Sequence, residues 1–195
     1  MSVKDKIPTK PKIIVCFTGM PGAGKSTAAK ATEEMGFEIL TMGDGVREET
    51  FRRGLPLNDE NVGLVMLDLR KKNGEGAVAK LILSKIESSE NRLIAIDGVR
   101  NLEEVETFKK VGLVKILAIH APQEIRYKFL TRRGRQDAPT SKDLSKIRDD
   151  REISVGVAKV IALADEIISN SSISIEDLRE ETRKIVGRWV TEVEE

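Results

Sequence analysis

Short apolar runs alternate with longer amphipathic segments over almost the whole chain. The short runs are rich in β-branched residues and are bounded by glycine, proline or polar residues, which is typical of β-strands. The longer segments repeat apolar residues with the period of an α-helix and end at capping residues or glycines. Strands are predicted at 13–18, 37–41, 93–96, 114–119 and 166–168. Helices are predicted at 24–35, 43–53, 60–72, 76–88, 102–111, 122–133, 146–163 and 175–188.

This alternation of strands and helices predicts an α/β fold in which helices cover both faces of a parallel sheet, giving three layers. Strands such as KIIVCF (12–17) and RLIAI (92–96) are apolar without interruption, as expected of strands that are buried on both sides. Residues 1–11 are expected to form a flexible tail before a single domain at 12–195. The polar stretch GRQDAPTSKDL (134–144) predicts a loop or a short lid at about 133–145.

Composition excludes several classes of protein. The 195 residues suffice for one domain, and 39% hydrophobic with 33% charged residues describe a globular chain. The net charge of +1 gives no overall field that would attract nucleic acid or an anionic membrane. No run approaches the roughly 20 apolar residues of a membrane span, and the N-terminal segment lacks the apolar core of a signal peptide. We therefore expect a cytoplasmic protein without a membrane partner.

The single cysteine and the single histidine carry no predicted chemistry. Cys16 lies inside an apolar run and has no partner for an internal disulfide, so a buried strand residue is the expected role. His120 ends a predicted strand without cysteine, histidine or carboxylate neighbours at the spacing of metal ligands. The chemistry of the chain therefore has to lie elsewhere.

The segment FTGMPGAGKST (17–27) contains the complete pattern G-x-x-x-x-G-K-[ST] between a predicted strand and a predicted helix. Glycines let such a loop curl so that its N–H groups and the N-terminus of the helix face the phosphates of a nucleotide. Lys25 would neutralise the β- and γ-phosphates, and the hydroxyl of Ser26 would bind Mg²⁺. The residues predicted to bind the nucleotide are Gly19, Met20, Pro21, Gly22, Ala23, Gly24, Lys25, Ser26 and Thr27.

A second ligand for Mg²⁺ is expected at the carboxyl end of a neighbouring strand, because ligands of open parallel sheets bind there. Asp97 follows the apolar run LIAI and is the candidate; the alternative is an ordinary aspartate of a turn before Gly98. Together these features predict a nucleoside triphosphate with Mg²⁺, either ATP or GTP. They leave the acceptor of the phosphate open.

Two further segments resemble known kinases. TMGDGVREE (41–49) and IDGVR (96–100) resemble the G-D-x-x-R and D-G-x-x-R segments of adenylate kinase and other nucleoside monophosphate kinases. ALADEIISNSSISIEDL (162–178) resembles dephospho-coenzyme A kinase. Over about 13–186 the chain is similar to an archaeal adenylate-kinase-related P-loop family. This resemblance implies a five-stranded parallel sheet, ATP and Mg²⁺, and an acceptor-binding insertion at about 43–90.

The resemblance also implies roles for individual residues. Arg47 and Arg100 match the arginines that hold the phosphate of the acceptor, and Asp44 would lie near the metal or its waters. A guanidinium group suits this role because it binds phosphate through two parallel hydrogen bonds. The alternative for each arginine is a surface ion pair, with Glu48 for Arg47 and Glu103 for Arg100.

The resemblance further implies that arginines from the lid and the helix after it act on the transferred phosphoryl group. Arg133 falls at the position of a lid arginine, and Arg148 and Arg151 fall on the returning helix. Charged runs are usually solvated helix faces, and Arg126 and Arg132 are assigned to that class.

Several positions depart from adenylate kinase. Met42 replaces the serine or threonine before G-D, and Phe129 replaces an arginine one turn before the lid pair. The D-G-x-x-R loop is one residue shorter, and the glutamine that reads adenine has no counterpart. The arginines that bind phosphate are therefore retained without the residues that recognise AMP. Met42 and Met66 could line a substrate pocket, although methionines on helices more often fill the core.

We therefore predict an enzyme of the P-loop phosphotransferase class that transfers the γ-phosphate of Mg²⁺-ATP to a small, nucleotide-like acceptor. Two alternatives stay open. One is an activity like that of dephospho-coenzyme A kinase, and the other is a nucleotide-dependent ATPase or switch that acts on RNA or on a protein partner. Aromatic residues make up only 4% of the chain and do not alternate with basic ones, so nucleic acid is not expected as a partner.

Overall fold

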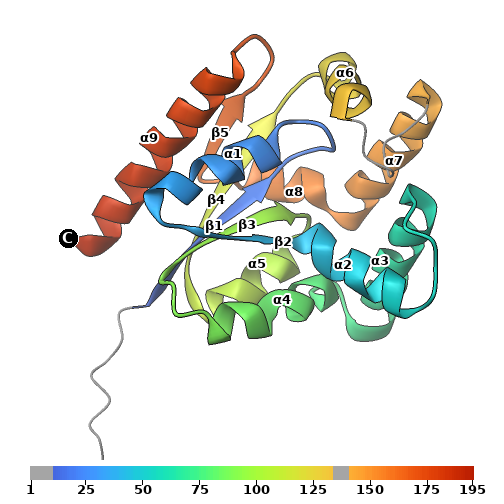
Figure 1. Ribbon diagram of the computed structural model, residues 1–195, viewed down its shortest axis with the longest axis horizontal. Coiled ribbons are helices and arrows are strands. Elements are labelled where there is room, and N and C mark those ends of the chain that lie inside the picture. The colour runs from blue at the N-terminus through green and yellow to red at the C-terminus, as the bar shows by residue number, and fades with distance from the viewer. Residues whose placement is uncertain (1–10, 134–140) are drawn as a thin grey trace, which may run out of the picture.

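A computed structural model describes residues 11–133 and 141–195, with the backbone alone at Arg133. Its centre is a five-stranded parallel sheet in the order β2-β3-β1-β4-β5 (Figure 1). The predicted five-stranded parallel sheet is therefore confirmed. The strands are β1 (Lys12–Thr18), β2 (Glu38–Thr41), β3 (Leu93–Val99), β4 (Gly112–His120) and β5 (Glu166–Ser169).

The uninterrupted apolar strands are buried on both faces, as predicted. In β1, every side chain from Ile13 to Phe17 is at most 1% exposed. This strand pairs with β3 on one side and β4 on the other. Alternate residues of β1 enter different cores, because successive side chains of a strand point to opposite faces of the sheet. The nucleotide loop is thus attached to the most deeply buried strand of the molecule.

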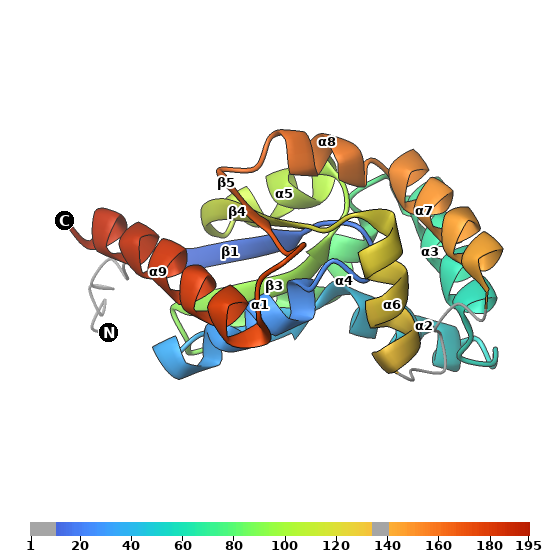
Figure 2. The same ribbon diagram turned by 90° about the horizontal axis from the view of Figure 1, so that it is seen from above.

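Helices cover both faces of the sheet and complete the three layers (Figure 2). One core packs α1 and α9 against the sheet, and Trp189 of α9 is 3% exposed within it. The other core contains residues of α4, α5 and α8. The helices are α1 (Lys25–Ala31), α2 (Met42–Arg52), α3 (Asp59–Asn73), α4 (Ala77–Ser88), α5 (Leu102–Lys109), α6 (Gln123–Arg133), α7 (Lys142–Val155), α8 (Val157–Ala162) and α9 (Ile175–Glu194), with a short 3₁₀ helix at Glu33–Met35.

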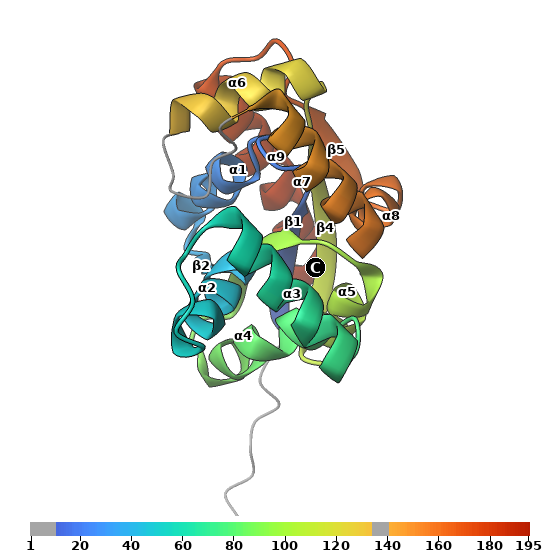
Figure 3. The ribbon, with the colours of Figure 1, turned by 90° about the vertical axis from the view of Figure 1, so that its right-hand side faces the viewer.

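Three helices are inserted between β2 and β3: α2, α3 and α4. The region between these two strands includes the segment 43–90 that is predicted to bind the acceptor. Helix α7 lies beside α3 (Figure 3), and ion pairs between Asp59 and the side chains of Arg148 and Arg151 join the two helices. The chain therefore brings the predicted acceptor segment against the helix that follows the predicted lid. Residues 134–140 of that lid lie outside the described part of the chain, as do residues 1–10 of the predicted tail.

Three local features differ from the prediction. Helix α7 begins at Lys142, inside the segment 134–144 that was expected to be a loop, because the Ser141 side chain caps it there. The helix expected at 146–163 is two helices, α7 and α8, because Gly156 with a φ of +114° ends the first one. Strand β3 continues to Val99 instead of ending at Ile96, and its register with β1 shifts between Phe17 and Thr18. Asp97 is therefore a strand residue that is 7% exposed, and the alternative of an ordinary turn aspartate is wrong.

Candidate functional site

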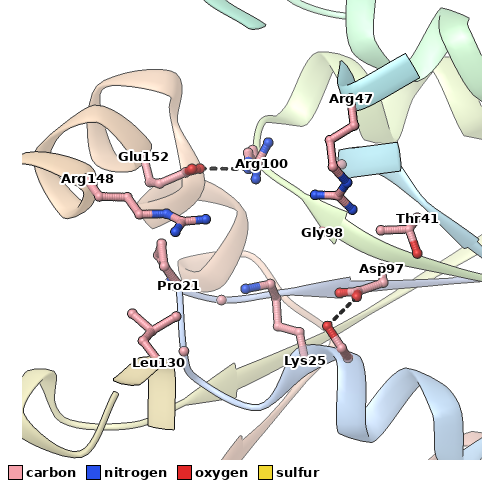
Figure 4. A pocket seen from close by; sticks show the side chains of 14 residues that line it. Pro21, Lys25, Thr41, Arg47, Asp97, Gly98, Arg100, Leu130, Arg148 and Glu152 are labelled. Carbon is pink, nitrogen blue, oxygen red and sulfur yellow. Dashed lines mark hydrogen bonds and ion pairs between the residues drawn. The ribbon is translucent and has the colours of Figure 1, made fainter. Parts of the chain in front are cut away.

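A cleft with about 590 Å³ of empty space lies at the carboxyl ends of β1 and β3 (Figure 4). This is the edge of a parallel sheet at which ligands generally bind. Four basic side chains, Lys25, Arg47, Arg100 and Arg148, point toward the same space from four different parts of the fold. The residues that line the cleft are Gly19, Pro21, Gly22, Lys25, Ser26, Thr41, Gly43, Arg47, Asp97, Gly98, Arg100, Leu130, Arg148 and Glu152.

The predicted nucleotide loop connects β1 to α1 and forms one wall of this cleft. Helix α1 begins at Lys25, and among the described residues no side chain caps its N-terminus. The first N–H groups of a helix have no acceptor within the helix, and the helix dipole adds positive potential there. This end of α1 therefore presents donors that suit an anion such as a phosphate.

At Gly22 the loop requires glycine for two reasons, its backbone conformation and its close packing against α6. Its φ is +79°, and a β-carbon at this position would lie 2.6 Å from the carbonyl oxygen of Arg126 and 2.9 Å from Cγ of Leu130. Any larger residue would collide with helix α6. The loop is consequently packed against α6 at this point, which the motif alone does not predict.

Lys25 extends back over its own loop, and its Nζ donates a hydrogen bond to the carbonyl oxygen of Met20 at 3.1 Å. Desolvation of the ammonium group lowers the pKa of Lys25 to about 8, although the nearby carboxylate of Asp97 opposes the shift. Burial disfavours the charged form of a lysine, and an adjacent anion favours it. A phosphate group placed beside Lys25 would therefore raise this pKa.

The lowered pKa predicts how ATP binding depends on pH. Below pH 8 Lys25 already carries its proton, so its full contribution to affinity is present. Above pH 8 the lysine must take up a proton when phosphates bind, and affinity should fall by up to about tenfold per pH unit. Calorimetry at pH 9 in buffers of different ionisation enthalpy should show proton uptake on binding of Mg²⁺-ATP. At pH 7 the uptake should be absent, and in Lys25→Ala it should be absent at both values. Equal uptake in wild type and Lys25→Ala at pH 9 would contradict the assignment.

Ser26 and Asp97, the two predicted metal ligands, lie side by side. The Ser26 hydroxyl donates a hydrogen bond to Oδ2 of Asp97 at 2.6 Å, across the first turn of α1 and the end of β3 (Figure 4). Within the described part of the chain, no group of three or more histidine, cysteine or carboxylate side chains is arranged so that it could hold a metal ion by itself. Mg²⁺ typically uses one or two protein oxygens and takes its other ligands from phosphates and water. The donor set of Ser26 and Asp97 therefore fits Mg²⁺ bound together with a nucleotide.

The two arginines that the resemblance assigns to the acceptor both face the cleft, and each has a carboxylate partner. Arg47 pairs with Asp44, whose side chain is 58% exposed and lies outside the cleft lining. Arg100 pairs through Nε with the buried Glu152 at 2.7 Å. These are not the ion-pair partners suggested by the sequence, which were Glu48 for Arg47 and Glu103 for Arg100. Glu48 pairs with Lys85 instead, and the charged partner of Arg100 is Glu152.

A second pocket, with about 360 Å³ of empty space, adjoins the cleft and shares Gly43, Arg47, Arg100, Arg148 and Glu152 with it. Arg151 lines this second pocket rather than the cleft beside the loop. Asp59 at the start of α3 accepts hydrogen bonds from Nη2 of Arg151 at 2.8 and 2.9 Å, and Nε of Arg148 lies 3.3 Å from it. Arg148 thus borders both pockets, whereas Arg151 belongs to the side of the inserted helices.

The assignment of Arg126 to a solvated helix face is wrong. Arg126 is 5% exposed and forms a buried ion pair with Asp149 of α7, with Nη2 2.6 Å from Oδ2. Its burial follows from the packing of α6 against the nucleotide loop. Arg132 is exposed, as predicted, and the side chain of Arg133 lies outside the described residues.

Several residues of the site were missed in the sequence: Thr41, Asp59, Leu130, Asp149 and Glu152. For Glu152 a local signal exists, because it follows Arg148 by four residues and therefore shares its helix face. Met42 is 1% exposed in the core, which confirms its role as filler. Met66 is 2% exposed in the same core and also lines the second pocket, so both predicted roles apply to it. Sδ of Met66 also accepts a hydrogen bond from Nη1 of Arg100 at 3.4 Å.

Comparison with known proteins places the chain in a family. A family model described as an AAA domain matches residues 18–147. A UPF0200 protein from Methanosarcina mazei is 38% identical over 180 residues, which cover 91% of this chain and 95% of the relative. The chain belongs to the UPF0200 family. In the described part of this UPF0200 chain, no helix is long and apolar enough to cross a membrane.

Two solved structures show the same fold. A shikimate kinase from Bacteroides thetaiotaomicron has a TM-score of 0.59 at 14% identity, covering 90% of this UPF0200 chain and 98% of the kinase. A sugar kinase from Janibacter sp. has a TM-score of 0.53 at 18% identity, covering 89% and 93%. These similarities show that the chain has the fold of these kinases, as predicted.

Proposed function

We propose that the chain is a kinase that transfers the γ-phosphoryl group of Mg²⁺-ATP to a small anionic acceptor. The observation that supports this most is the convergence of Lys25, the Ser26–Asp97 pair and three arginines on one cleft. A protein that only bound a nucleotide would have no need of Arg47 and Arg100 on the side away from the loop. Those two residues provide a place for a second anion opposite the first.

The transfer relies on position and charge, without a covalent intermediate on the protein. The loop and Lys25 hold the phosphates of ATP, and Ser26 with Asp97 holds Mg²⁺. The metal, when bound, neutralises charge on the phosphate oxygens. An oxygen of the acceptor bonds to the γ-phosphorus while the bond to the β,γ-bridging oxygen breaks and ADP leaves. Arg148, which borders both pockets, stabilises the negative charge of the transferred group. From the kinase resemblance, Arg133 and Arg151 are also assigned to stabilising the charge of the transferred phosphoryl group.

Arg47 is the best placed anchor for the acceptor. Its partner Asp44 is mostly solvated, so an incoming phosphate or carboxylate can replace it at little cost. Arg100 is held by Glu152, whose side chain is only 4% exposed, and losing this partner would leave a buried unpaired charge. We therefore assign the anion of the acceptor to Arg47 first, with Arg100 beside it, while Asp44 holds Arg47 in place until the acceptor replaces it. The kinase resemblance favours a nucleotide-like acceptor.

A screen of ADP release identifies the acceptor class. Mg²⁺-ATP is supplied with nucleoside monophosphates, dephospho-coenzyme A, or small hydroxylated acids and sugars, one at a time. We expect ADP release to depend on one of these compounds. Arg47→Met should raise the KM for that acceptor by about 10- to 100-fold, the loss of a charge-assisted phosphate contact, and should leave the KM for ATP unchanged.

Arg52→Met is the matched control because Arg52 lies on the same helix with its side chain 77% exposed, and it should behave as wild type. ATP hydrolysis that rises only with RNA or a protein partner would overturn the kinase assignment and favour the switch. If ADP release depended on dephospho-coenzyme A alone, that compound would be the acceptor and the proposal of a nucleoside monophosphate would be wrong.

A further inference from the structure

Residues 149–152, one turn of α7, carry three ion pairs to three different elements. Asp149 pairs with Arg126 of α6, and Glu152 pairs with Arg100 at the end of β3. The third pair joins Arg151 to Asp59 of α3. Residues 148–152 therefore connect α6, which packs on the nucleotide loop, with the end of β3 and with the inserted helix α3. The pair between Arg126 and Asp149 is the most deeply buried of the three, with side chains 6% and 7% exposed.

The guanidinium group of Arg126 makes four hydrogen bonds to described residues. Nη1 and Nη2 donate to Oδ1 and Oδ2 of Asp149 at 2.8 and 2.6 Å, which is the two-pronged geometry of a strong guanidinium–carboxylate pair. Nη1 also donates to the carbonyl oxygen of Pro21 at 2.9 Å, and Nε donates to the carbonyl oxygen of Ala121 at 3.2 Å. Gln123 donates to the same carboxylate at 3.2 Å. Arg126 thus joins the nucleotide loop to α7 through one planar group.

The loop is held at two consecutive residues. The side chain of Arg126 holds the carbonyl oxygen of Pro21, and the carbonyl oxygen of Arg126 faces the Cα of Gly22, where a β-carbon would lie 2.6 Å away. The C=O and N–H groups of a trans peptide point in opposite directions. With the oxygen of Pro21 turned to Arg126, the N–H of Gly22 points away from Arg126. Arg126 of α6 therefore fixes the orientation of this peptide, whose Gly22 N–H belongs to the loop that is predicted to bind the phosphates.

We propose that Arg126 and Asp149 are positioning residues of the nucleotide loop. Arg126 orients the peptide between Pro21 and Gly22, and Asp149 orients Arg126. The same pair fixes α7 against α6, so that Arg148 and Glu152, the neighbours of Asp149 on α7, face the cleft. The inference rests on the proposed function only in that the loop binds Mg²⁺-ATP. Stability alone does not account for such a pair, because buried ion pairs can often be replaced by apolar residues without loss.

Two variants separate positioning from stability. The double variant Arg126→Met/Asp149→Leu leaves no buried charge unpaired. Its melting temperature should therefore stay near that of wild type. The carbonyl of Pro21 still lacks its donor, and affinity for Mg²⁺-ATP should be about tenfold weaker, the loss of one charge-assisted hydrogen bond. Arg126→Lys keeps the buried charge for Asp149 but loses the planar fork, and it should also bind Mg²⁺-ATP about tenfold more weakly while staying folded.

Glu124→Gln is the matched control. Glu124 pairs with Lys142 between the same two helices, with both side chains at least 60% exposed and without contact to the loop. The Glu124→Gln variant should have the melting temperature of wild type and the same affinity for Mg²⁺-ATP. Wild-type affinity in the double variant or in Arg126→Lys would overturn the inference and leave a purely structural pair. A wild-type protein that binds Mg²⁺-ATP but transfers no phosphate would overturn only the kinase assignment, whereas failure to bind Mg²⁺-ATP would overturn both.

Discussion

Lys25→Ala is expected to reduce phosphoryl transfer by about 1,000-fold or more while the protein stays folded. Lys25 is the basic residue of the loop motif, and among the described residues its Nζ makes one hydrogen bond, to the carbonyl oxygen of Met20. Removing it therefore takes positive charge away from the phosphates and little from the fold. Desolvation of its ammonium group is itself unfavourable, so the free energy of unfolding should change little or increase slightly.

The measurement is single-turnover transfer at saturating Mg²⁺-ATP, with circular dichroism and thermal melting to verify the fold. Lys30→Ala is the control because Lys30 is an exposed residue in the last turn of the same helix, and it should transfer at the wild-type rate. Lys25→Arg tests geometry, since it keeps the charge but replaces a compact ammonium by a bulky planar group. Full turnover in Lys25→Ala would exclude the proposed mechanism.

Asp97→Asn should lower kcat by about 100-fold and shift the Mg²⁺ requirement to higher concentration. Asparagine has nearly the same shape and still accepts the hydrogen bond from Ser26 Oγ, which spans 2.6 Å in the native site. It lacks the charge that holds a divalent cation against the nucleotide. The change therefore isolates the role of the carboxylate from the packing of β3, where Asp97 is almost fully buried.

The informative measurement compares ATP binding with and without metal. If Asp97 acts through Mg²⁺, Asp97→Asn should weaken binding of Mg²⁺-ATP but leave metal-free ATP equal or tighter, because one negative charge near the phosphates is gone. The substitution should also lower the pH at which ATP affinity begins to fall, since Asp97 is the largest influence that raises the pKa of Lys25. An unchanged Mg²⁺ requirement would rule out Asp97 as a metal ligand.

The chemistry of the donor side was predictable because its signals are local or follow a general rule of sheets. The loop from Gly19 to Ser26 is one continuous motif, and its place between β1 and α1 follows from periodicity. Ser26 and Asp97 are 71 residues apart, yet their meeting was predicted because parallel strands bring their carboxyl ends to one edge. The continuation of β3 beyond Ile96 was not predicted, since the shift in register depends on the neighbouring strand.

The partners of the arginines were not predictable in the same way. Sequence offers nearby acids as partners, whereas Arg100 pairs with Glu152, on a helix that follows the predicted lid. Arg126 lies in the charged segment EIRYKFLTRR, whose composition indicates a solvated helix. Its burial depends on Asp149, 23 residues away, and on the carbonyl of Pro21, 105 residues away.

By itself the sequence determined the strands and helices, the parallel α/β fold and the nucleotide loop, because periodicity, capping and motif spacing act over short distances along the chain. The tertiary structure decided which charges pair, which arginines face the cleft and how α6 holds the loop. Ion pairing and desolvation depend on distances in space, and packing brings groups within 3 Å that are separated by much of the chain. The assignment of Arg126 to a positioning role could therefore come only from the folded protein.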